Sequence, residues 1–528
     1  MQIYGRVLFK ATRPKADLRA APRLRPLRAA HVAPATRVPS MLGPATFRFL
    51  NETRDLDSCG WDDPQCLKLW RYNLHYFDDL AATQAGDRRD WHRALILRWI
   101  SENPPGHGSG WEPYPISLRV VNWIKWGVLV EPLDDAAIHS LAVQMRWLCK
   151  RIEWHLLGNH LLANAKALVI AGLFFEGPEA EGWLAKGLAI LARQLPEQVL
   201  ADGGHFELSP MYHAIILEDL MDILAMAESF GQSAQPEIAG MRDIVTRMRA
   251  WLAAMTHPDG GPAFFNDAAF GIAPRREALE AYAGRLEMPQ VSSPGEGAHH
   301  LVASGYVRVN RGPVAAILDA AAIGPDYIPG HAHADTLSFE LSHAGERVLV
   351  NTGTSTYEAG ARRKAERATA AHNTVEIDGL DSSEVWSSFR VARRARITDL
   401  EITHDAGTDR IGAAHDGYRA RLPGRPLHRR TWTFTADAVT IDDAIEGAQP
   451  PPAVARYHLA PGITAALEAS GTAGALVTRA GNRLHWRSSC PMRLEAGTWS
   501  PEFGRRVPNQ HLVAALGNGR MSMTIGWS

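Results

Sequence analysis

Four short segments of the sequence gather residues that transfer protons or bind cations. They are GNH at 158–160, ADGGHFELSPMYH at 201–213, GHAHADTLSFEL at 330–341 and AHNTVEID at 371–378. Imidazole and phenol groups serve as general acids and bases when they lie within hydrogen-bond reach of a substrate proton. Imidazoles are also common metal ligands, so each segment has two possible chemistries.

The first two segments have both a structural and a functional interpretation. Asn159 and His160 come at the start of an apolar helix, where they form either an N-cap with a core histidine or an amide donor and an imidazole facing one pocket. His205, Glu207 and Tyr212 lie in a loop between helices, which is either a turn or the wall of a site. The phenol of Tyr212 could equally satisfy a buried acceptor at a helix start.

The third and fourth segments suggest a metal site. His331 and His333 are two residues apart just before a strand, so an extended backbone projects both imidazoles to one side. This arrangement suits a metal ligand or a base beside a ligand, and a polar strand edge is the alternative. His372, ahead of another alternating run, could complete a three-ligand site with His333 and a polar residue after Val350.

Composition excludes several classes of protein. The chain has 528 residues, 46% of them hydrophobic and 21% charged, and a formal charge of -1, so it lacks the basic field of a nucleic-acid binder. Its longest apolar stretches, such as 163–175, are too short for a membrane span. The four cysteines are predicted to be free thiols, with a local bridge between Cys59 and Cys66 as the alternative.

The first half of the chain after the N-terminal region is predicted to be helical. Apolar residues recur at helical spacing, and short turns rich in Gly and Pro separate the segments, which favours antiparallel helix neighbours. The predicted helices cover 91–100, 116–130, 134–157, 161–175, 182–194, 213–230 and 236–255.

The second half is predicted to be an antiparallel β-sandwich. Period-two alternation marks strands at 301–309, 314–318, 337–341 and 347–350, and His343 to Glu346 reads as a hairpin turn. The boundary falls in the stretch VSSPGEG at 291–297. We therefore predict a poorly structured arm over 1–44, an all-α domain over 45–292 and the sandwich over 293–528.

The segments quoted above, in this order, resemble those of the heparinase II/III family of polysaccharide lyases. KLWRYNLHYFDDL at 68–80 and NPPGHGSGWEPYPISLRVVNWIKW at 103–126 also look like that family, so the resemblance spans roughly residues 45–400. It implies an N-terminal (α/α) toroid followed by a C-terminal antiparallel β-sandwich, in agreement with the predicted boundary.

The resemblance also implies a reaction, the β-elimination of a uronate-containing glycan. The C5 proton lies α to a carboxylate and becomes acidic only when donors offset that charge, a role that falls to Asn159 with His160. Tyr212 matches the acid and could also serve as the base, with His331 as the alternative base. A tyrosine base needs a nearby donor or cation, because a free phenol has a pKa of about 10.

Substrate binding is expected from residues near these segments. Trp111 and Tyr114 could stack on sugar rings or belong to the core, and Arg119 could pair with a substrate carboxylate or solvate a helix face. His205 and Glu207 are expected in the same site.

Some family members hold a metal with two histidines and an aspartate, which correspond here to His333, Asn351 and His372. Asn351 in place of aspartate removes a negative charge and weakens the site for a divalent metal, of which zinc is the favoured one. Ala163 and Leu208 stand where many members have glutamate and arginine. These losses of charge bear on the identity of the substrate more than on the reaction.

The expected partner is therefore an acidic polysaccharide or oligosaccharide, with no nucleic acid and no membrane span, and the chain could form a homo-oligomer. Family resemblance favours the periplasm, but no signal peptide is readable over 1–40, which leaves the cytoplasm open. Two other functions stay open. One is an inverting glycoside hydrolase on the same scaffold, which needs two carboxylates about 6.5–9.5 Å apart and could recruit them from Asp202, Glu207, Asp267 and Asp335. The other is a glycan-binding protein without activity.

Overall fold

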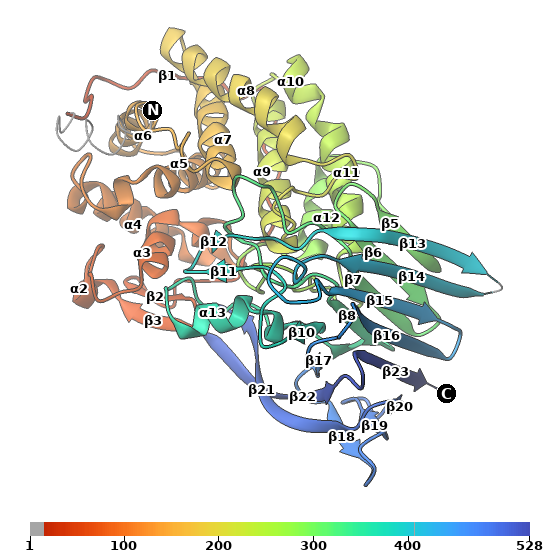
Figure 1. The fold of residues 1–528 in the computed structure, drawn as a ribbon. Helices are drawn as coiled ribbons and strands as arrows, with labels where there is room; N and C mark the ends of the chain where they lie inside the picture. Colours follow the sequence, from red (N-terminus) through yellow and green to blue (C-terminus); the bar gives the residue numbers. More distant parts are fainter. Residues whose placement is uncertain (1–14, 406, 528) are drawn as a thin grey trace. The chain divides into compact units, whose positions relative to one another are not determined.

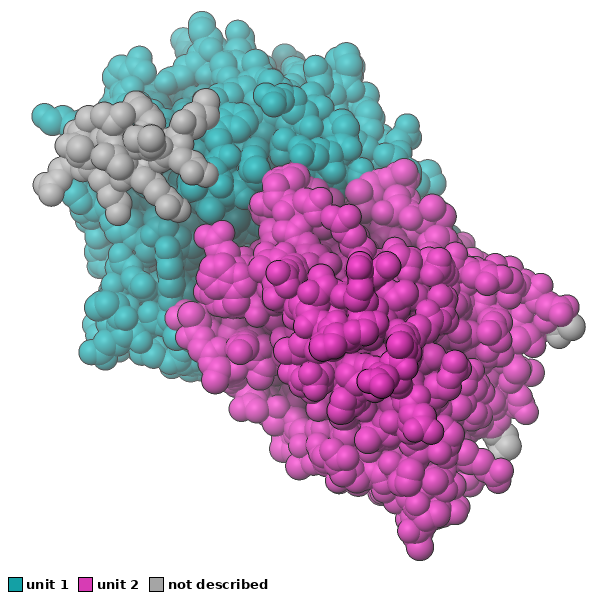
Figure 2. Space-filling model, in the orientation of Figure 1, with its two compact units in different colours: residues 1–199, 214–247, 277–290 teal, residues 200–213, 248–276, 291–528 magenta. Residues whose placement is uncertain are grey.

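The computed structural model describes residues 15–405 and 407–527, which divide into two compact units (Figures 1 and 2). Unit 1 comprises the described parts of residues 1–199, 214–247 and 277–290, and unit 2 those of residues 200–213, 248–276 and 291–528. The first fourteen residues of the predicted arm lie outside the described ranges.

The helical elements follow one another along the first half of the chain, as the spacing of apolar residues predicts. In chain order they are α2 (Leu56–Cys59), α3 (Lys68–Tyr76), α4 (Arg89–Glu102), α5 (Pro113–Leu129), α6 (Asp135–Cys149), α7 (Gly158–Phe174), α8 (Pro178–Gln198), α9 (Pro210–Ser229), α10 (Pro236–Ala239), α11 (Met241–Ala254) and α12 (Arg276–Arg285).

Local sequence signals explain where these helices begin. The carboxylate of Asp134 accepts a hydrogen bond from the backbone N–H of Ala137 and so caps α6. Pro113 and Pro178 occupy the first positions of α5 and α8, where a missing N–H costs nothing. The helix predicted to run to 157 ends instead at Cys149, because the backbone N–H of Glu153 bonds to the side chain of Asn164 at 2.9 Å.

Helix α7 is buried along almost its whole length and contacts α5, α6 and α8. Its approach to α8 is close, since a Cβ added at Gly172 would lie 2.6 Å from Leu184 and one at Gly187 2.7 Å from Val169. This packing fixes the N-terminal end of α7, which carries Asn159 and His160.

The described part of the arm is irregular and hydrogen bonded to unit 1. Its β1 (Arg23–Leu24) pairs with β4 (Phe175–Glu176). The guanidinium of Arg25 donates to the carbonyl of Leu173, and Arg37 forms an ion pair with the buried Glu218. A hairpin of β2 (Thr46–Phe49) and β3 (Glu52–Asp55) follows the arm.

Unit 2 contains three larger sheets whose strands all pair antiparallel with their neighbours (Figure 1). The first has the order β5 (Gly297–Leu301), β6 (Tyr306–Arg311), β7 (Val314–Asp319), β8 (Phe339–His343), β9 (Glu346–Leu349). The second has the order β10 (Val375–Ile377), β17 (Ala453–His458), β22 (Arg505–Ala515), β21 (Met492–Glu502). The third has the order β13 (Ile397–Asp405), β14 (Thr408–His415), β15 (Leu427–Phe434), β16 (Ala438–Glu446), β23 (Arg520–Trp527), β20 (Arg483–Ser488), β19 (Ala473–Val477), β18 (Thr464–Leu467).

One apolar core joins these three sheets, as a sandwich requires. Phe339 of the first sheet, Tyr457 of the second and Trp432 of the third are fully buried in it, and the Phe339 ring centroid lies 6.1 Å from that of Trp432. The predicted hairpin at 343–346 is present between β8 and β9, with φ of 48° at Ala344 and 89° at Gly345. The predicted fold class, helices followed by antiparallel sheets, is confirmed.

Two segments from the helical half of the sequence, residues 200–213 and 248–276, belong to unit 2, and the chain leaves unit 1 for the last time at Gln290. Residues 200–213 and 248–276 supply Leu208, Trp251 and Phe265 to a second apolar cluster with Tyr306 of β6. The phenol of Tyr306 donates to the carbonyl of Leu208 at 2.8 Å. These contacts bring Tyr212 and the 201–213 loop into unit 2.

The sequence also predicts free cysteines and no membrane span. All four cysteines are free, as predicted. Over residues 15–405 and 407–527 no helix combines the length and apolar character needed to cross a membrane.

A buried ion pair connects the third sheet to the loops that precede β8 and β10. The guanidinium of Arg430 donates to both oxygens of Asp443, at 2.8 and 2.9 Å, and to the carbonyls of Leu337 and Asn373. His428 contacts the same carboxylate at 2.7 Å. Burial by itself would raise the pKa of Asp443, but Arg430 and His428 outweigh it and hold the pKa at about 2.

We expect Asp443→Asn to lower the free energy of unfolding by about 3–5 kcal/mol at pH 7, because Arg430 would be left buried without its partner. A carboxylate with a depressed folded pKa stabilises fully above its unfolded pKa of about 3.9 and loses that effect as pH falls through the folded value. The stability difference from wild type should therefore be constant from pH 7 to 5 and shrink between about pH 4 and 2. Urea denaturation at several pH values measures it.

Asp442→Asn is the matched control, because Asp442 is the exposed neighbour of Asp443 on the same strand. We expect it to change stability by less than about 0.5 kcal/mol. Equal effects of the two substitutions would contradict the role given to the buried pair.

Candidate functional site

The predicted site residues fall into both compact units, and each group is described within its own unit. Unit 1 holds Asn159 and His160 at the start of α7. Unit 2 holds Tyr212 at the start of α9 and His331 in the loop before β8.

A strained turn presents the Asn159 and His160 pair. Leu157 has φ 57° and ψ -153°, a conformation that non-glycine residues rarely adopt, and Gly158 follows with φ 52°. His160 keeps 34% of its side chain exposed, and its Nδ1 lies 3.2 Å from Oε1 of Glu153. Of the pair, His160 is thus partly exposed at the start of an apolar helix, whereas Asn159 is buried.

Aromatic rings flank this pair. The ring of Tyr114 lies 4.4 Å from the His160 ring between centroids and 5.9 Å from the ring of Tyr76. Tyr114 is half-buried, whereas Tyr76 is buried. Of the residues expected to bind sugar from unit 1, Tyr114 is thus the one placed beside the candidate pair.

Trp111 and Arg119 lie in the core of unit 1. The indole N–H of Trp111 donates to the carbonyl of Asn103 at 3.2 Å. Arg119 is fully buried, donates to Gln144 and to the carbonyls of Gly110 and His75, and stacks 3.7 Å from the Trp99 ring centroid. These contacts give both residues a packing role and leave neither of them exposed for a sugar.

In unit 2, two phenols and an imidazole meet at the start of α9. The hydroxyl groups of Tyr212 and Tyr357 are 2.9 Å apart. The ring of Tyr212 stacks on that of His331, with 3.9 Å between centroids and 29° between planes. The predicted acid and the predicted alternative base are therefore in direct contact.

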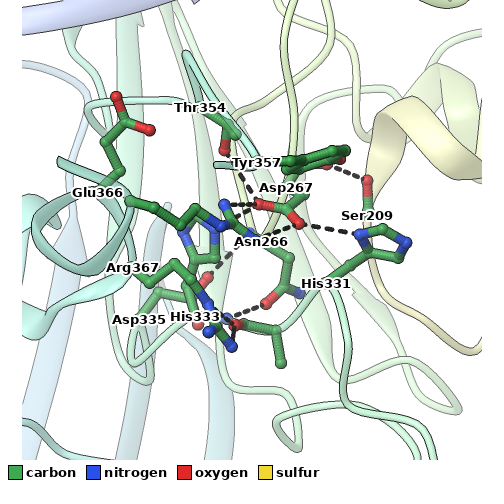
Figure 3. Close-up of polar contacts among 12 residues, drawn as sticks. Ser209, Asn266, Asp267, His331, His333, Asp335, Thr354, Tyr357, Glu366 and Arg367 are labelled. Atoms are coloured by element: carbon green, nitrogen blue, oxygen red, sulfur yellow. Dashed lines mark hydrogen bonds and ion pairs between the residues drawn. The ribbon is translucent and has the colours of Figure 1, made fainter. Parts of the chain in front are cut away.

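The carboxylate of Asp267 organises this group (Figure 3). Nδ1 of His331 lies 2.9 Å from Oδ2 of Asp267, and Nε2 of His333 lies 2.9 Å from Oδ1. Arg363 donates to both carboxylate oxygens, and Thr354 donates to Oδ1. One buried anion thus fixes two histidine rings at once.

The charges around Asp267 determine its protonation state. Burial alone would raise the pKa of Asp267, but the guanidinium of Arg363 and the hydrogen bonds from His331 and His333 hold it well below the usual range. An ionised Asp267 accepts the Nδ1–H of His331 and leaves Nε2 of that ring for substrate chemistry.

Tyr357 has the opposite tendency. Burial and the negative charge of Asp267 raise its pKa well above the usual value, so it remains a neutral phenol at physiological pH. A neutral Tyr357 can donate its proton to the hydroxyl oxygen of Tyr212. Such a donor stabilises the phenolate form of Tyr212 that base catalysis requires.

The loop before α9 and the loop around Asn266 hold these groups in place. The hydroxyl of Ser209 donates to the carbonyl of Asp267 and accepts from the backbone N–H of Tyr212. Asn266, at φ 55°, donates to the carbonyl of Leu208 and accepts from the backbone N–H of His333. Backbone and side-chain hydrogen bonds together fix Tyr212, Asp267 and His333 within one framework.

The predicted neighbours His205 and Glu207 also lie in unit 2. Oε2 of Glu207 is 3.6 Å from Nε2 of His331, so this carboxylate lies on the side of the ring opposite Asp267. His205 is fully buried, and burial lowers its pKa to about 4. Its backbone N–H donates to Nδ1 of His213.

His333 and His372 face each other, with 3.2 Å between Nδ1 of His333 and Nε2 of His372. The other ring nitrogen of each histidine, the outer one, has a fixed acceptor. Nε2 of His333 donates to Asp267, and Nδ1 of His372 donates to the carbonyl of Ala368 at 2.8 Å. Burial lowers the pKa of both histidines to about 4, so both rings are neutral at pH 7. Their inner nitrogens then present two lone pairs to each other, an arrangement that a shared cation would stabilise.

The third predicted ligand, Asn351, is hydrogen bonded within the fold. Its Oδ1 accepts from the backbone N–H of Asn373 at 3.1 Å, and its Nδ2 donates to Ser338 at 3.4 Å. Over residues 15–405 and 407–527 no three His, Cys, Asp or Glu side chains are grouped so as to hold a metal ion. The structure therefore brings His333 and His372 together, whereas the side-chain oxygen of Asn351 already accepts a hydrogen bond from the backbone of Asn373.

Several residues of these groups have contacts that the sequence does not predict; from sequence, Asp267 is expected only as a carboxylate that a hydrolase could recruit. Asp267 follows Asn266 between apolar runs, and that polar pair is a usable signal for a buried site. Arg363 sits in a run of charges on α13 (Ala361–Arg367) that predicts an exposed helix, and nothing in its context distinguishes it from Arg362. Tyr357 and Glu153 have no local signature at all.

Two protein-family models together match most of the chain. The family model "Heparinase II/III N-terminus" matches residues 68–285, and "Heparinase II/III-like, C-terminal" matches residues 293–528. A heparin-sulfate lyase of Bacteroides stercoris is 29% identical over 250 residues, which are 43% of this chain and 37% of the relative. FtsZ-localized protein C of Caulobacter vibrioides is 25% identical over 389 residues, 69% of this chain and 63% of the relative.

The chain thus spans between about a third and two thirds of the length of these two relatives. Among solved structures, that of heparinase III has a TM-score of 0.71 at 17% identity. The match covers 89% of this chain and 79% of the heparinase III chain. This similarity supports the arrangement of a helical region followed by antiparallel sheets.

We expect Arg363→Met to lower the free energy of unfolding by about 3–5 kcal/mol, because it leaves the Asp267 carboxylate buried without its cation. Urea denaturation followed by circular dichroism measures the loss. Arg362→Met on the same helix is the control, since the side chain of Arg362 is 44% exposed. A loss no larger than that of the control would mean that Arg363 does not stabilise the buried anion.

Proposed function

Because the chain belongs to the heparinase II/III-like family, we propose that it is a polysaccharide lyase that cleaves a uronate-containing glycan by β-elimination. Glycosaminoglycans are the favoured substrate class, since heparin-sulfate lyases are among its relatives. The observation that carries the proposal is the contact of Tyr212 with both Tyr357 and His331.

This contact supplies what an elimination needs at the reacting atoms. Tyr212, in its phenolate form beside the neutral donor Tyr357, takes the C5 proton, and its phenol then protonates the departing oxygen at C4. His331 is the alternative base, since Asp267 orients its ring through Nδ1 and Nε2 lies on the opposite side of the ring, 3.6 Å from Glu207. The C4–O bond breaks as a C4=C5 double bond forms, so no water is consumed.

The carboxylate of the uronate must be neutralised before C5 becomes acidic. We assign this to the amide of Asn159 and the imidazole of His160, which the strained turn at Leu157 presents. Glu153 favours the tautomer of His160 that carries a proton on Nδ1, and Tyr114 packs against the ring. Tyr114 is the sugar-stacking candidate of this group.

The hydrolase alternative is less well supported, because the candidate carboxylates have other partners. Asp267 is paired with Arg363, and Asp202 accepts from Ser304 and Gly204. Asp335 is buried and accepts from the backbone N–H of Asn266. An inverting hydrolase needs one carboxylate free to activate water.

We further propose that His333 and His372 bind a divalent cation, for which zinc is favoured by the imidazole donors. Each ring donates its outer N–H to a fixed acceptor, which is the usual support for a histidine metal ligand. A bound cation would hold the two rings together and so stabilise the loop that carries His331. Asn351 contributes a neutral oxygen in this proposal, and affinity should be lower than with aspartate.

The proposed reaction predicts a rise in ultraviolet absorbance when the protein meets a uronate glycan, because the new C4=C5 bond is conjugated with the carboxylate. The panel should contain heparan sulfate, chondroitin sulfate, hyaluronan and alginate. We expect Tyr212→Phe to lower turnover at least about a hundredfold, the contribution of a lost acid or base, while glycan affinity stays close to that of wild type.

Tyr418→Phe is the control, since Tyr418 is a buried tyrosine of unit 2 whose hydroxyl donates to the carbonyl of Val375. It should retain the rate of wild type. New reducing ends without absorbance would favour the hydrolase, and binding without either signal would favour the glycan-binding protein.

The metal proposal predicts that the protein, stripped with a chelator, takes up one Zn²⁺ measurable by calorimetry. His372→Ala should lower that affinity by about tenfold or more, whereas His485→Ala, on the exposed side of β20, should leave it unchanged. Zinc uptake that is equal in wild type and His372→Ala would exclude the pair as ligands.

A further inference from the structure

Large exposed aromatic side chains are few in this protein. Within the described ranges they are Trp154, Tyr327, Trp386 and Phe389, with exposed fractions of 39%, 53%, 55% and 42%. Three of these four belong to unit 2 and lie in segments that adjoin the His331 and Asp267 group. Exposed aromatic surface close to a reactive group points to a ligand that covers it.

Trp386 and Phe389 belong to a small hairpin formed by β11 (Val385–Trp386) and β12 (Arg390–Val391). Trp386 is paired with Arg390, and Ser387 at φ 51° turns the chain. A two-stranded hairpin of this size has little stability of its own, so contacts elsewhere must hold its shape.

Two buried arginines of α13 supply those contacts. Arg363 donates through Nε to the carbonyl of Ser388 at 3.1 Å, and Arg367 donates to the carbonyls of Ser387 and Arg390 at 3.0 and 3.2 Å. Arg363 also binds Asp267, so the same side chain fixes the hairpin and the carboxylate that orients His331. The hairpin is thus built into the framework of the candidate site.

Phe389 extends this framework to the reacting groups. Its ring centroid lies 6.1 Å from that of His331 and 5.2 Å from that of Tyr357, and the Arg363 guanidinium lies 5.6 Å from it. An aromatic surface that starts at the candidate base therefore continues onto the hairpin.

The hairpin is also basic. Arg390 lies in the hairpin and Arg393 follows it, whereas the next arginine, Arg394, is paired with Asp326 at 2.7 Å. Arg390 is exposed, and no ion pair of its side chain occurs among the described residues. Sugar rings stack on aromatic faces, and arginine pairs with sulfate or carboxylate in two parallel hydrogen bonds. Aromatic and basic groups together match a charged sugar and match a purely apolar partner poorly.

We propose that the β11–β12 hairpin is a binding subsite for an acidic sugar of the substrate chain, outside the sugar that reacts. Trp386 stacks on the ring of this sugar, and Arg390 pairs with its sulfate or carboxylate. The proposal rests on the proposed lyase function for its ligand class, and it gives the site a preference for longer oligosaccharides.

The test uses the full-length protein and heparan sulfate oligosaccharides of eight and of two sugar units. With the octasaccharide, Trp386→Ala should raise KM about tenfold and leave kcat within about twofold, because stacking away from the reacting sugar contributes to binding alone. With the disaccharide the two proteins should not differ. Trp386→Phe should restore the wild-type KM for the octasaccharide, since any aromatic ring can stack.

Calorimetry in the Tyr212→Phe background separates binding from turnover. Arg390→Ala should weaken octasaccharide binding at about 0.05 M salt and much less at about 0.5 M, whereas the effect of Trp386→Ala should persist at both. Arg483→Ala removes an exposed arginine of β20 and is the control for the loss of one positive charge. It should weaken octasaccharide binding much less than Arg390→Ala does.

The outcomes distinguish this inference from the proposed function. Cleavage with an unchanged KM in Trp386→Ala would overturn the subsite and leave the lyase in place. Octasaccharide binding that depends on Trp386, without any absorbance change, would support the subsite and overturn the lyase. Absence of both binding and cleavage would overturn both.

Discussion

The buried carboxylate of Asp267 is the constraint on which the candidate site of unit 2 depends. It accepts hydrogen bonds from His331, His333, Thr354 and Arg363, and so it sets the positions of both histidines. An ionised carboxylate at zero exposure is unfavourable unless a cation and several donors surround it. The need to satisfy this one anion therefore forces residues from three separate loops and a helix into a fixed arrangement.

That arrangement gives side chains of the same residue type different environments. Tyr212 is placed against an imidazole and a second phenol, whereas Tyr357 is kept neutral by burial and by the charge of Asp267. His331 retains some exposure, but His333 has almost none and turns its inner nitrogen toward His372. Environment rather than residue type thus separates the groups that can act on a substrate from those that hold the framework.

Patterns along the chain were sufficient to predict the fold class. Helical spacing and period-two alternation identify α4 to α9 and β6 to β9, since these elements bury one face or all of their surface. The same patterns cannot show that residues 200–213 and 248–276 pack with the sheets, because Trp251 and Leu208 are apolar in either environment. Asn159, His160, Tyr212 and His331 could be singled out by their types, but Asp267, Arg363 and Tyr357 acquire their roles only through contacts distant in sequence.

Arg119 and Arg363 show why a buried arginine cannot be interpreted from sequence. Both are fully buried, yet Arg119 donates to carbonyls, an amide and an aromatic face, and burial without a carboxylate partner lowers its pKa well below the usual range. Arg363 has the Asp267 anion as its partner, and that charge together with their hydrogen bond outweighs burial and raises its pKa. The first arginine therefore stabilises a helical core, whereas the second connects the carboxylate that binds His331 to the β11–β12 hairpin. Without Asp267 this connection between the hairpin and His331 would be lost, because Arg363 bonds to no other carboxylate among the described residues.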